Sequence, residues 1–188
     1  MIKQSKPKKC KAKDCGKEFV PVRPLQQVCS PTCALRYSAM KGAKKQALDA
    51  KLQRREYRDA KDKAKPRGEW AKEAQTAFNS WVRARDADDS CISCGSHTGK
   101  QNAGHYRSVG SSPELRFEPD NCHLQCERCN SYLSGNLINY RINLIKKIGA
   151  DRVEWLEGKH EAKHYSIEDL QDIKKRYSGM ARELRGRI

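Results

Sequence analysis

The chain has 188 residues, of which 37% are hydrophobic, 33% are charged and only 7% are aromatic. This polar composition excludes one large self-sufficient core, so we expect a modest globular domain with appended segments. The formal net charge of +16 makes nucleic acid the first partner to consider, because neutralising phosphates gives sequence-independent affinity. No N-terminal apolar run and no stretch of roughly 20 apolar residues is present, so we expect neither secretion nor membrane insertion.

Residues 1–37 are predicted to form a small module that folds around a metal ion. Cysteine alternates there with Lys, Pro and Gly, and core-forming residues are almost missing. Nine cysteines without a secretory leader favour metal-bound thiolates over disulfides. The spacing C-x4-C-x13-C-x3-C lies within the range of zinc ribbons, so the predicted ligands of a structural zinc are Cys10, Cys15, Cys29 and Cys33.

Residues 38–68 are predicted to be a basic helical arm. Residues 1–68 together hold 20 Lys/Arg against 6 Asp/Glu, and residues 38–65 consist largely of good helix formers. Leu48 and Leu52 give only a thin apolar stripe, so the helix should be exposed, and Pro66 should end it. The alternative is a solvated arm without a partner. The cations expected to contact DNA backbones are Lys44, Lys45, Arg54, Arg55 and Arg58.

Residues 69–165 are predicted to form the main domain. Apolar residues recur at three- and four-residue spacing over 69–85, which predicts a packed helix. Short strands are expected around 104–109 and 115–118. Two C-x-x-C knuckles enclose 31 residues and predict a second closed zinc site, formed by Cys91, Cys94, Cys126 and Cys129.

Two further helices are predicted towards the C-terminus. The first should cover the back of the site with a stripe formed by Leu137, Ile138, Ile142, Ile145 and Ile148. The second, in a separate segment 166–188, should begin at a capping box formed by Ser166 and Asp169. Its apolar stripe should pack against the chain's own domain, with a dimer seam as the alternative.

The interval between the knuckles contains the candidate catalytic residues. A site of four thiolates has no open position for water, so other groups must carry any chemistry. The candidates are His105, Asn121, His123 and Asn130, whereas Cys122 is expected to be a buried free thiol.

The motifs "GHY" at 104–106, Asn121 five residues before Cys126, and "CERCN" at 126–130 resemble the His-Asn-His (ββα-metal) nuclease motif, in a His-Asn-Asn variant. Over nearly its whole length the chain is similar to the lambdoid phage NinG/Rap recombination proteins. The resemblance implies an α+β fold, mostly helical and irregular, and structure-specific cleavage of branched DNA such as Holliday junctions. A phage protein of this kind would act in the cytoplasm of its host bacterium.

The resemblance also implies roles for individual residues. His105 would be the general base, with Asn121 orienting its ring by a hydrogen bond between backbone and ring. Asn130 would help to hold one Mg²⁺ or Mn²⁺ ion, with His123 as a second ligand. Apart from the resemblance, Arg107, Arg116 and Arg128 lie close to the motif in sequence and could clamp phosphate, or would simply be surface charge.

One departure from the motif concerns the metal. Many members carry Asp or Glu just before the first His, where this chain has Gly104. The residues that could complete the metal shell are Asp120, Glu118, His123 and Asn136, with His123 first.

Two other functions are considered. A non-catalytic zinc adaptor that binds RNA or DNA is the main alternative, and a transcription regulator is weak because no helix-turn-helix pattern is found. A homodimer would suit junction resolution, which needs two paired cuts, and its interface could lie in residues 166–185 or 38–65.

Overall fold

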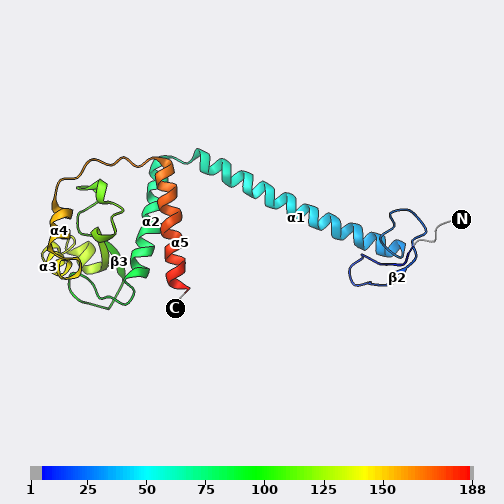
Figure 1. The fold of residues 1–188 in the computed structure, drawn as a ribbon, viewed down its shortest axis with the longest axis horizontal. Coiled ribbons are helices and arrows are strands. Elements are labelled where there is room, and N and C mark those ends of the chain that lie inside the picture. Colours follow the sequence, from blue (N-terminus) through cyan, green and yellow to red (C-terminus); the bar gives the residue numbers. More distant parts are fainter. Residues whose placement is uncertain (1–5, 187–188) are drawn as a thin grey trace. The chain divides into compact units, whose positions relative to one another are not determined.

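The computed structural model describes residues 6–186, and these are mostly helical with two small antiparallel sheets (Figure 1). The chain divides into two compact units, and the boundary between them in the sequence lies between Ala64 and Lys65. No helix in the described range is both long and apolar enough to cross a membrane.

The first unit is a two-stranded sheet followed by a long helix. Strands β1 (Lys8–Lys9) and β2 (Glu18–Phe19) pair antiparallel, and helix α1 runs over Pro31–Ala64. The helix therefore begins seven residues before the predicted start and contains the last cysteine of the zinc module. Ser30 accepts a hydrogen bond from the amide of Cys33 at 3.2 Å, and Pro31 has no amide hydrogen to lose, so both favour a helix start here.

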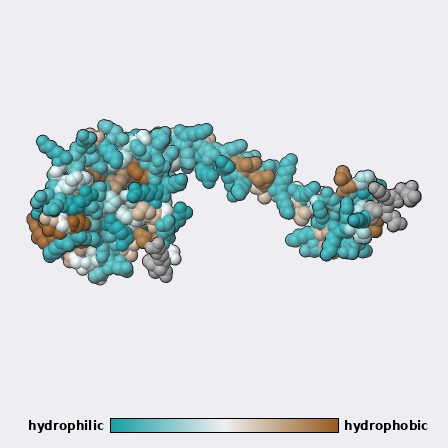
Figure 2. Space-filling view, in the orientation of Figure 1, coloured by the Kyte–Doolittle hydropathy of each residue, from teal (hydrophilic) through white to brown (hydrophobic). Residues whose placement is uncertain are grey.

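The surface of α1 agrees with the prediction of an exposed charged helix. Cys33 is its only buried residue among those described, and Leu48 and Leu52 are exposed. Figure 2 shows one small hydrophobic area part-way along its otherwise hydrophilic surface. Packing therefore contributes little to the stability of α1 beyond its first turn.

The second unit is built on a pair of helices, α2 (Arg67–Arg85) and α5 (Ile167–Arg185). Buried Phe78 and Trp81 of α2 pack against Tyr177 of α5, with ring centroids 4.9 Å and 4.8 Å apart. The capping box of Ser166 and Asp169 is present. The apolar stripe of α5 packs against α2 in the same unit, as the main prediction for this helix expected.

A β-hairpin lies against α2 and comprises β3 (Gln101–His105) and β4 (Cys122–Cys126). The prediction of strands at 104–109 and 115–118 was therefore wrong in position. The segment between the strands instead forms two short 3₁₀ turns, η1 (Pro113–Leu115) and η2 (Pro119–Asn121). A proline begins each turn, and its fixed φ and missing amide hydrogen disfavour a strand there.

Three short helical elements follow the hairpin: the π-helical turn η3 (Arg128–Tyr132), α3 (Leu137–Ile148) and α4 (Ala150–Glu157). The sequence did not predict α4 as a separate helix. The predicted stripe of α3 was also wrong in part, because Tyr140 and Leu144 are buried whereas Leu137, Ile138 and Ile142 are exposed. Buried Val153 and Leu156 of α4 share a second core with Tyr140 and Leu144, and this contact selects the buried face of α3.

Candidate functional site

The first cysteine cluster can hold a zinc ion. The sulfur atoms of Cys10, Cys15, Cys29 and Cys33 all lie within 4.8 Å of one another. The turn of the β1–β2 hairpin presents the first two, the segment just before α1 presents Cys29, and the first turn of α1 presents Cys33. Four thiolates from two elements form a closed tetrahedral donor set, which is typical of structural zinc.

The second cysteine cluster has the same chemistry in the second unit. Cys91, Cys94, Cys126 and Cys129 also place their sulfur atoms within 4.8 Å of one another. The amide of Ile92 donates to the carbonyl of Leu124 at 3.0 Å, so the first knuckle is anchored to β4. A zinc ion here would connect the loop before β3 to the end of β4 and to η3.

His105, at the end of β3, is held by a backbone carbonyl. Its Nε2 lies 3.0 Å from the carbonyl oxygen of Arg116, and its ring is 6.0 Å from that of Phe78. Because a carbonyl oxygen only accepts, Nε2 carries the proton, and the lone pair of Nδ1 faces the buried thiol of Cys122, whose Sγ lies 3.7 Å away. Burial lowers the pKa of His105 below its usual 6.5, so the neutral ring is favoured at neutral pH.

Asn121 is fully buried and holds the loop that follows His105. Its Oδ1 accepts from the amide of Arg107 at 2.8 Å, and its Nδ2 donates to the carbonyls of Arg107 and Leu115 at 3.0 and 3.1 Å. Asn121 therefore fixes the backbone after His105, whereas the predicted bond to the ring is made by the carbonyl of Arg116.

The structure does not bring His123 to His105. In the hairpin, Gly104 pairs with His123 and His105 pairs with Cys122, so the two histidines lie on opposite faces. Arg85 donates to Nδ1 of His123 at 3.1 Å, and Nε2 lies 3.1 Å from the carbonyl of Asp120, so no lone pair remains for a metal.

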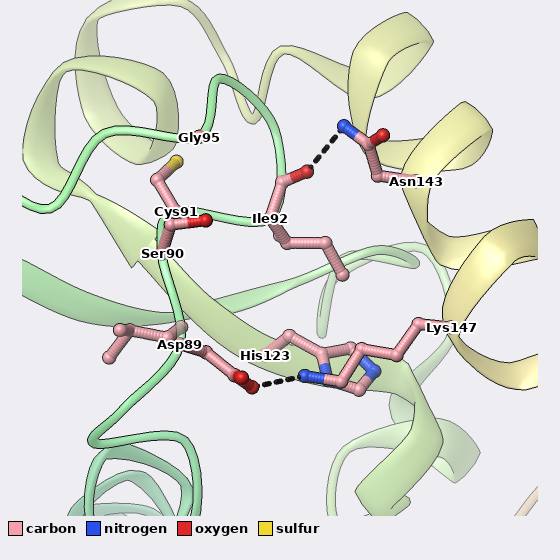
Figure 3. A pocket seen from close by; sticks show the side chains of 9 residues that line it. Asp89, Ser90, Cys91, Ile92, Gly95, His123, Asn143 and Lys147 are labelled. Atoms are coloured by element: carbon pink, nitrogen blue, oxygen red, sulfur yellow. Dashed lines mark hydrogen bonds and ion pairs between the residues drawn. The ribbon is translucent and has the colours of Figure 1, made fainter.

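His123 lines a different pocket, shown in Figure 3. There it lies near Lys147, whose ammonium group binds Asp89 at 2.6 Å. Ile92 and Asn143 close another side of this pocket with a hydrogen bond of 2.8 Å. Lys147 and Asn143 of α3 thus bind the segment that carries the first C-x-x-C knuckle, and these bonds hold α3 against it.

His105 and Asn130 line one pocket of about 480 Å³ together with Arg107. The remaining walls come from the loop after β3 and from the segment between η3 and α3, including Ser108, Ser111, Ser134 and Gly135. Of the four residues predicted as catalytic, His105 and Asn130 therefore line one pocket. Asn121 does not line it, but its hydrogen bonds hold Arg107, which does.

The other residues considered for the metal shell have protein partners elsewhere. Arg152 of α4 binds Asp120 at 2.7 Å and Glu118 at 2.8 Å. Asn136 places its Nδ2 3.5 Å from the sulfur of Cys129 and accepts from Asn139. None of the three lines the pocket of His105.

The space beside Gly104 is taken by Gln125, a residue that the sequence did not single out. A Cβ atom on Gly104 would lie 2.1 Å from Oε1 of Gln125. This oxygen is buried and has no hydrogen-bond partner among residues 6–186. Gln125 therefore fills the space that a side chain at position 104 would need.

The predicted phosphate-binding cations differ in their surroundings. Arg107 lines the pocket of His105 and Arg128 is exposed. Arg116 instead donates to Oε1 of Gln75 at 2.7 Å, which ties it to α2. The arm residues Lys44, Lys45, Arg54, Arg55 and Arg58 are all exposed on α1.

A second basic surface, which we call the α2–α5 groove, was not predicted. It has a volume of about 570 Å³, and the residues that line it include Lys72, Thr76, Ser80, Lys174, Ser178, Arg182 and Arg185. Its one acidic residue, Glu73, is neutralised by Lys65 and Lys174. Each helix alone shows only scattered cations, so the groove became visible only once their packing was known.

Arg85 and Asp86 form another unpredicted feature, at the C-terminus of α2. Arg85 binds Asp86 at 2.6 Å and donates to the carbonyl of Cys122 at 2.8 Å. Asp86 accepts from the amide of Leu124 at 3.0 Å, and the adjacent guanidinium offsets burial and keeps the pKa of this carboxyl low. The pair attaches β4 to α2.

The family model and the relatives that match this chain all carry the same family name. The family model described as "Bacteriophage Lambda NinG protein" matches residues 2–186. The chain is 39% identical over 190 residues to Protein ninG of Escherichia phage lambda, covering 95% of this chain and 93% of the relative. It is also 39% identical to Protein ninG of Salmonella phage P22, with coverage of 95% and 94%. No solved structure matches the chain.

Proposed function

The chain belongs to the family of bacteriophage lambda NinG proteins, and we propose that it is a divalent-cation-dependent endonuclease that cuts branched DNA such as Holliday junctions. The observation that carries the proposal is the pocket shared by His105, Arg107 and Asn130. A neutral base, a cation and an amide oxygen converge there. These are groups that phosphodiester hydrolysis requires.

In this mechanism His105 is the general base. The Nε2 proton is committed to the carbonyl of Arg116, so Nδ1 would take the proton from the attacking water, which would replace its 3.7 Å contact with Sγ of Cys122. Burial disfavours the imidazolium and keeps the base neutral at the pH of the cell. Asn121 holds the loop that begins directly after His105 and so fixes the position of Arg107.

The scissile phosphate would be bound by Arg107, whose guanidinium forms charge-assisted hydrogen bonds with phosphate oxygens. Asn130 offers an amide oxygen in the same pocket, a donor that fits Mg²⁺ or Mn²⁺. When bound, the ion would supply charge stabilisation of the phosphate and the leaving oxygen. The closed thiolate clusters would serve as structural zinc sites only.

DNA would be held mainly by two basic surfaces, the exposed cations of α1 and the α2–α5 groove. Lys72, Arg182 and Arg185 of the groove have no carboxylate partner in the described part of the chain. The hydroxyl groups of Thr76, Ser80 and Ser178 add donors for phosphate oxygens. The occupant that fits this combination of charge and hydroxyls is a nucleic-acid backbone.

A branched substrate is favoured by the arrangement within the second unit. Helix α2 contacts the hairpin on one side and α5 on another (Figure 1), so the pocket of His105 and the α2–α5 groove do not share a wall. Two separate phosphate-binding places suit a substrate with more than one duplex arm. A linear duplex would engage them less well.

The test is an assay of the purified, zinc-loaded chain on four-way, flap and linear duplex DNA with Mg²⁺, Mn²⁺ or EDTA. We expect cation-dependent cleavage that is fastest on branched DNA. Loss of the general base in His105→Ala should lower the rate by about 10²- to 10⁴-fold. The matched control is His97→Ala, which removes an exposed histidine of the same unit and should leave the rate unchanged.

Zinc content and circular dichroism of each variant establish that it is folded. A folded His105→Ala protein that nicks branched DNA as fast as the wild type would refute the role of His105. Salt-sensitive DNA binding without cleavage under any cation would instead support a non-catalytic zinc adaptor.

A further inference from the structure

An apolar area is exposed between η3 and the middle of α3. Of the six large hydrophobic side chains that are exposed in the described part of the second unit, five lie there. Figure 2 shows hydrophobic residues gathered at the edge of this unit, where Figure 1 places α3. Single exposed apolar residues are common, but a cluster of this kind usually marks a binding surface. We call it the η3–α3 patch, and its members are Tyr132, Leu133, Leu137, Ile138 and Ile142.

The patch lies on the side of α3 that faces away from the core. Ile138 and Ile142 are one turn apart, and the helical period places them opposite Tyr140 and Leu144, which are buried against α4. Ile138 is 80% exposed and Tyr132 is 77% exposed. The apolar face is therefore open to a partner.

The patch borders the pocket proposed for catalysis. Leu137 belongs to both, and the pocket-lining residues Ser134 and Gly135 lie between Leu133 and Leu137 in the chain. The carbonyl of Gly135 accepts a hydrogen bond from Gln125 at 2.6 Å, so this corner of the chain is held in place. A molecule with a phosphate in the pocket would therefore meet the patch at the pocket's rim.

The charge around the patch favours nucleic acid over a second copy of this chain. Residues 128–142 contain two arginines and neither Asp nor Glu. Arg141 binds Glu157 at 2.7 Å, whereas Arg128 is exposed and has no carboxylate partner in the described part of the chain. Arg107 adds a third cation from the pocket. A second copy would bring the same positive charges against these, whereas a DNA backbone supplies the opposite charge.

The part of DNA that fits an apolar surface is the face of a base. In a linear duplex these faces are stacked on one another, and a side chain that enters between them must first open the stack. At a branch point the stack is already interrupted, so a side chain reaches the base faces at a lower cost. An apolar patch at the rim of the pocket would therefore favour branched DNA over linear duplex.

We propose that the η3–α3 patch is a wedge that contacts unstacked bases at the branch point of the DNA and thereby places a neighbouring phosphate in the pocket. This inference rests on the proposed function and assigns the surface that recognises its branched substrate. Tyr132 would stack on a base, while Leu133 and Ile138 would fill the gap in the stack.

The test uses the zinc-loaded full chain in buffer without Mg²⁺ or Mn²⁺, so that DNA is bound and not cut. The probe is a four-way junction that carries 2-aminopurine, a base whose fluorescence rises when it is unstacked, either at the branch point or in the middle of an arm. The wild type should raise the fluorescence at the branch point and leave it unchanged in the arm.

Two single variants remove the wedge, and both replace exposed side chains, so they should fold normally. Tyr132→Ala and Ile138→Ser should each reduce the rise at the branch point. Tyr132→Ala should also weaken binding to the junction by about 5- to 150-fold, the range for losing one base stacked on an aromatic ring. Tyr132→Phe keeps the ring and should behave like the wild type. The matched control is Val22→Ser, which removes a side chain that is 86% exposed in the first unit and should leave the signal unchanged.

The salt dependence of binding separates the wedge from the cations. Contact with base faces releases no counterions from phosphates, so Tyr132→Ala should weaken junction binding by the same factor at low and high salt. Its affinity for linear duplex should stay close to that of the wild type.

The inference is overturned if folded, zinc-replete Tyr132→Ala or Ile138→Ser raises the branch-point signal as strongly as the wild type. It is also overturned if the variants lose equal affinity for junction and linear duplex, or if they only lower the sedimentation mass, which would make the patch an interface between copies. In each of these cases cleavage of branched DNA by the wild type leaves the proposed function standing. A wild type that raises the signal but cuts no DNA under any cation overturns the proposed function and supports the wedge, and one that binds no branched DNA overturns both.

Discussion

The α2–α5 groove gives the most quantitative prediction about DNA binding. Lys72, Arg182 and Arg185 line it without a carboxylate partner among the described residues, so replacing them with alanine breaks no ion pair. Arg185 does donate to the hydroxyl of Ser80, but this contact is at the surface. We therefore expect the triple variant to fold normally and to differ from the wild type mainly in its interaction with phosphates.

The expected effect follows from counterion release. Each neutralised phosphate contributes about 0.9 to the slope of log affinity against log salt concentration on duplex DNA. Losing three contacts should reduce the slope by about 2.7, so between 50 and 200 mM salt the wild type should lose about 40-fold more affinity than the variant. Fluorescence anisotropy with a labelled duplex at several salt concentrations measures both slopes.

The control for this experiment is a triple variant with the same change in charge outside the groove. Lys146, Lys159 and Lys175 are exposed and do not line the groove, so their replacement should leave the slope nearly unchanged. If both triple variants change the slope equally, binding depends only on net charge, and the groove has no special role. An unchanged slope in the groove variant would refute the assignment directly.

Three further predictions address the base, the loop and the zinc sites. Because burial lowers the pKa of His105, the folded state resists protonation of this ring. The acid limb of the pH–rate profile should therefore lie below pH 6.5. The free energy of unfolding that this group contributes should fall only as the pH drops below 6.5. A limb above pH 6.5 would contradict this. Asn121→Asp can still accept from the Arg107 amide but cannot donate to the two carbonyls, so its free energy of unfolding should fall by about 2–4 kcal/mol, measured in urea with Asn121→Ala for comparison. Removal of zinc with a strong chelator should unfold residues 6–30, seen as loss of amide protection, and metal-independent protection there would exclude a zinc-nucleated module.

The sequence was most informative where chemistry depends on local spacing. The two C-x-x-C knuckles identify the second cluster because each tight turn brings two thiolates together without help from the rest of the fold. Helix α2 was also predictable, since Trp70, Phe78 and Trp81 recur on one face. Such signals require only a few neighbouring residues.

Contacts that depend on register or on the backbone left no such signal. His123 was the preferred metal ligand until the pairing of Gly104 with His123 placed its side chain on the other face of the hairpin. The carbonyl that holds His105 belongs to Arg116, and a backbone acceptor can come from any residue type. Gln125 resembles an ordinary strand residue, and only the 2.1 Å between its Oε1 and the place of a Cβ on Gly104 shows that it excludes a side chain there.

The candidate site is assembled from short segments. Their positions are set more by local cross-links, meaning side-chain hydrogen bonds and clustered thiolates, than by an apolar core. Its walls come from the loop after β3 and the segment from η3 to α3, neither of which has a long regular element. Four thiolates, the Asn121 bonds and the Gln125 bonds each fasten one of these segments to the hairpin. The α2–α5 core also holds Phe117 and Cys122 by apolar packing that needs none of these cross-links, so a cross-link can fail while most of the helix content remains. Loss of one cross-link should therefore first displace the pocket residues, and activity should decline before global unfolding is detectable.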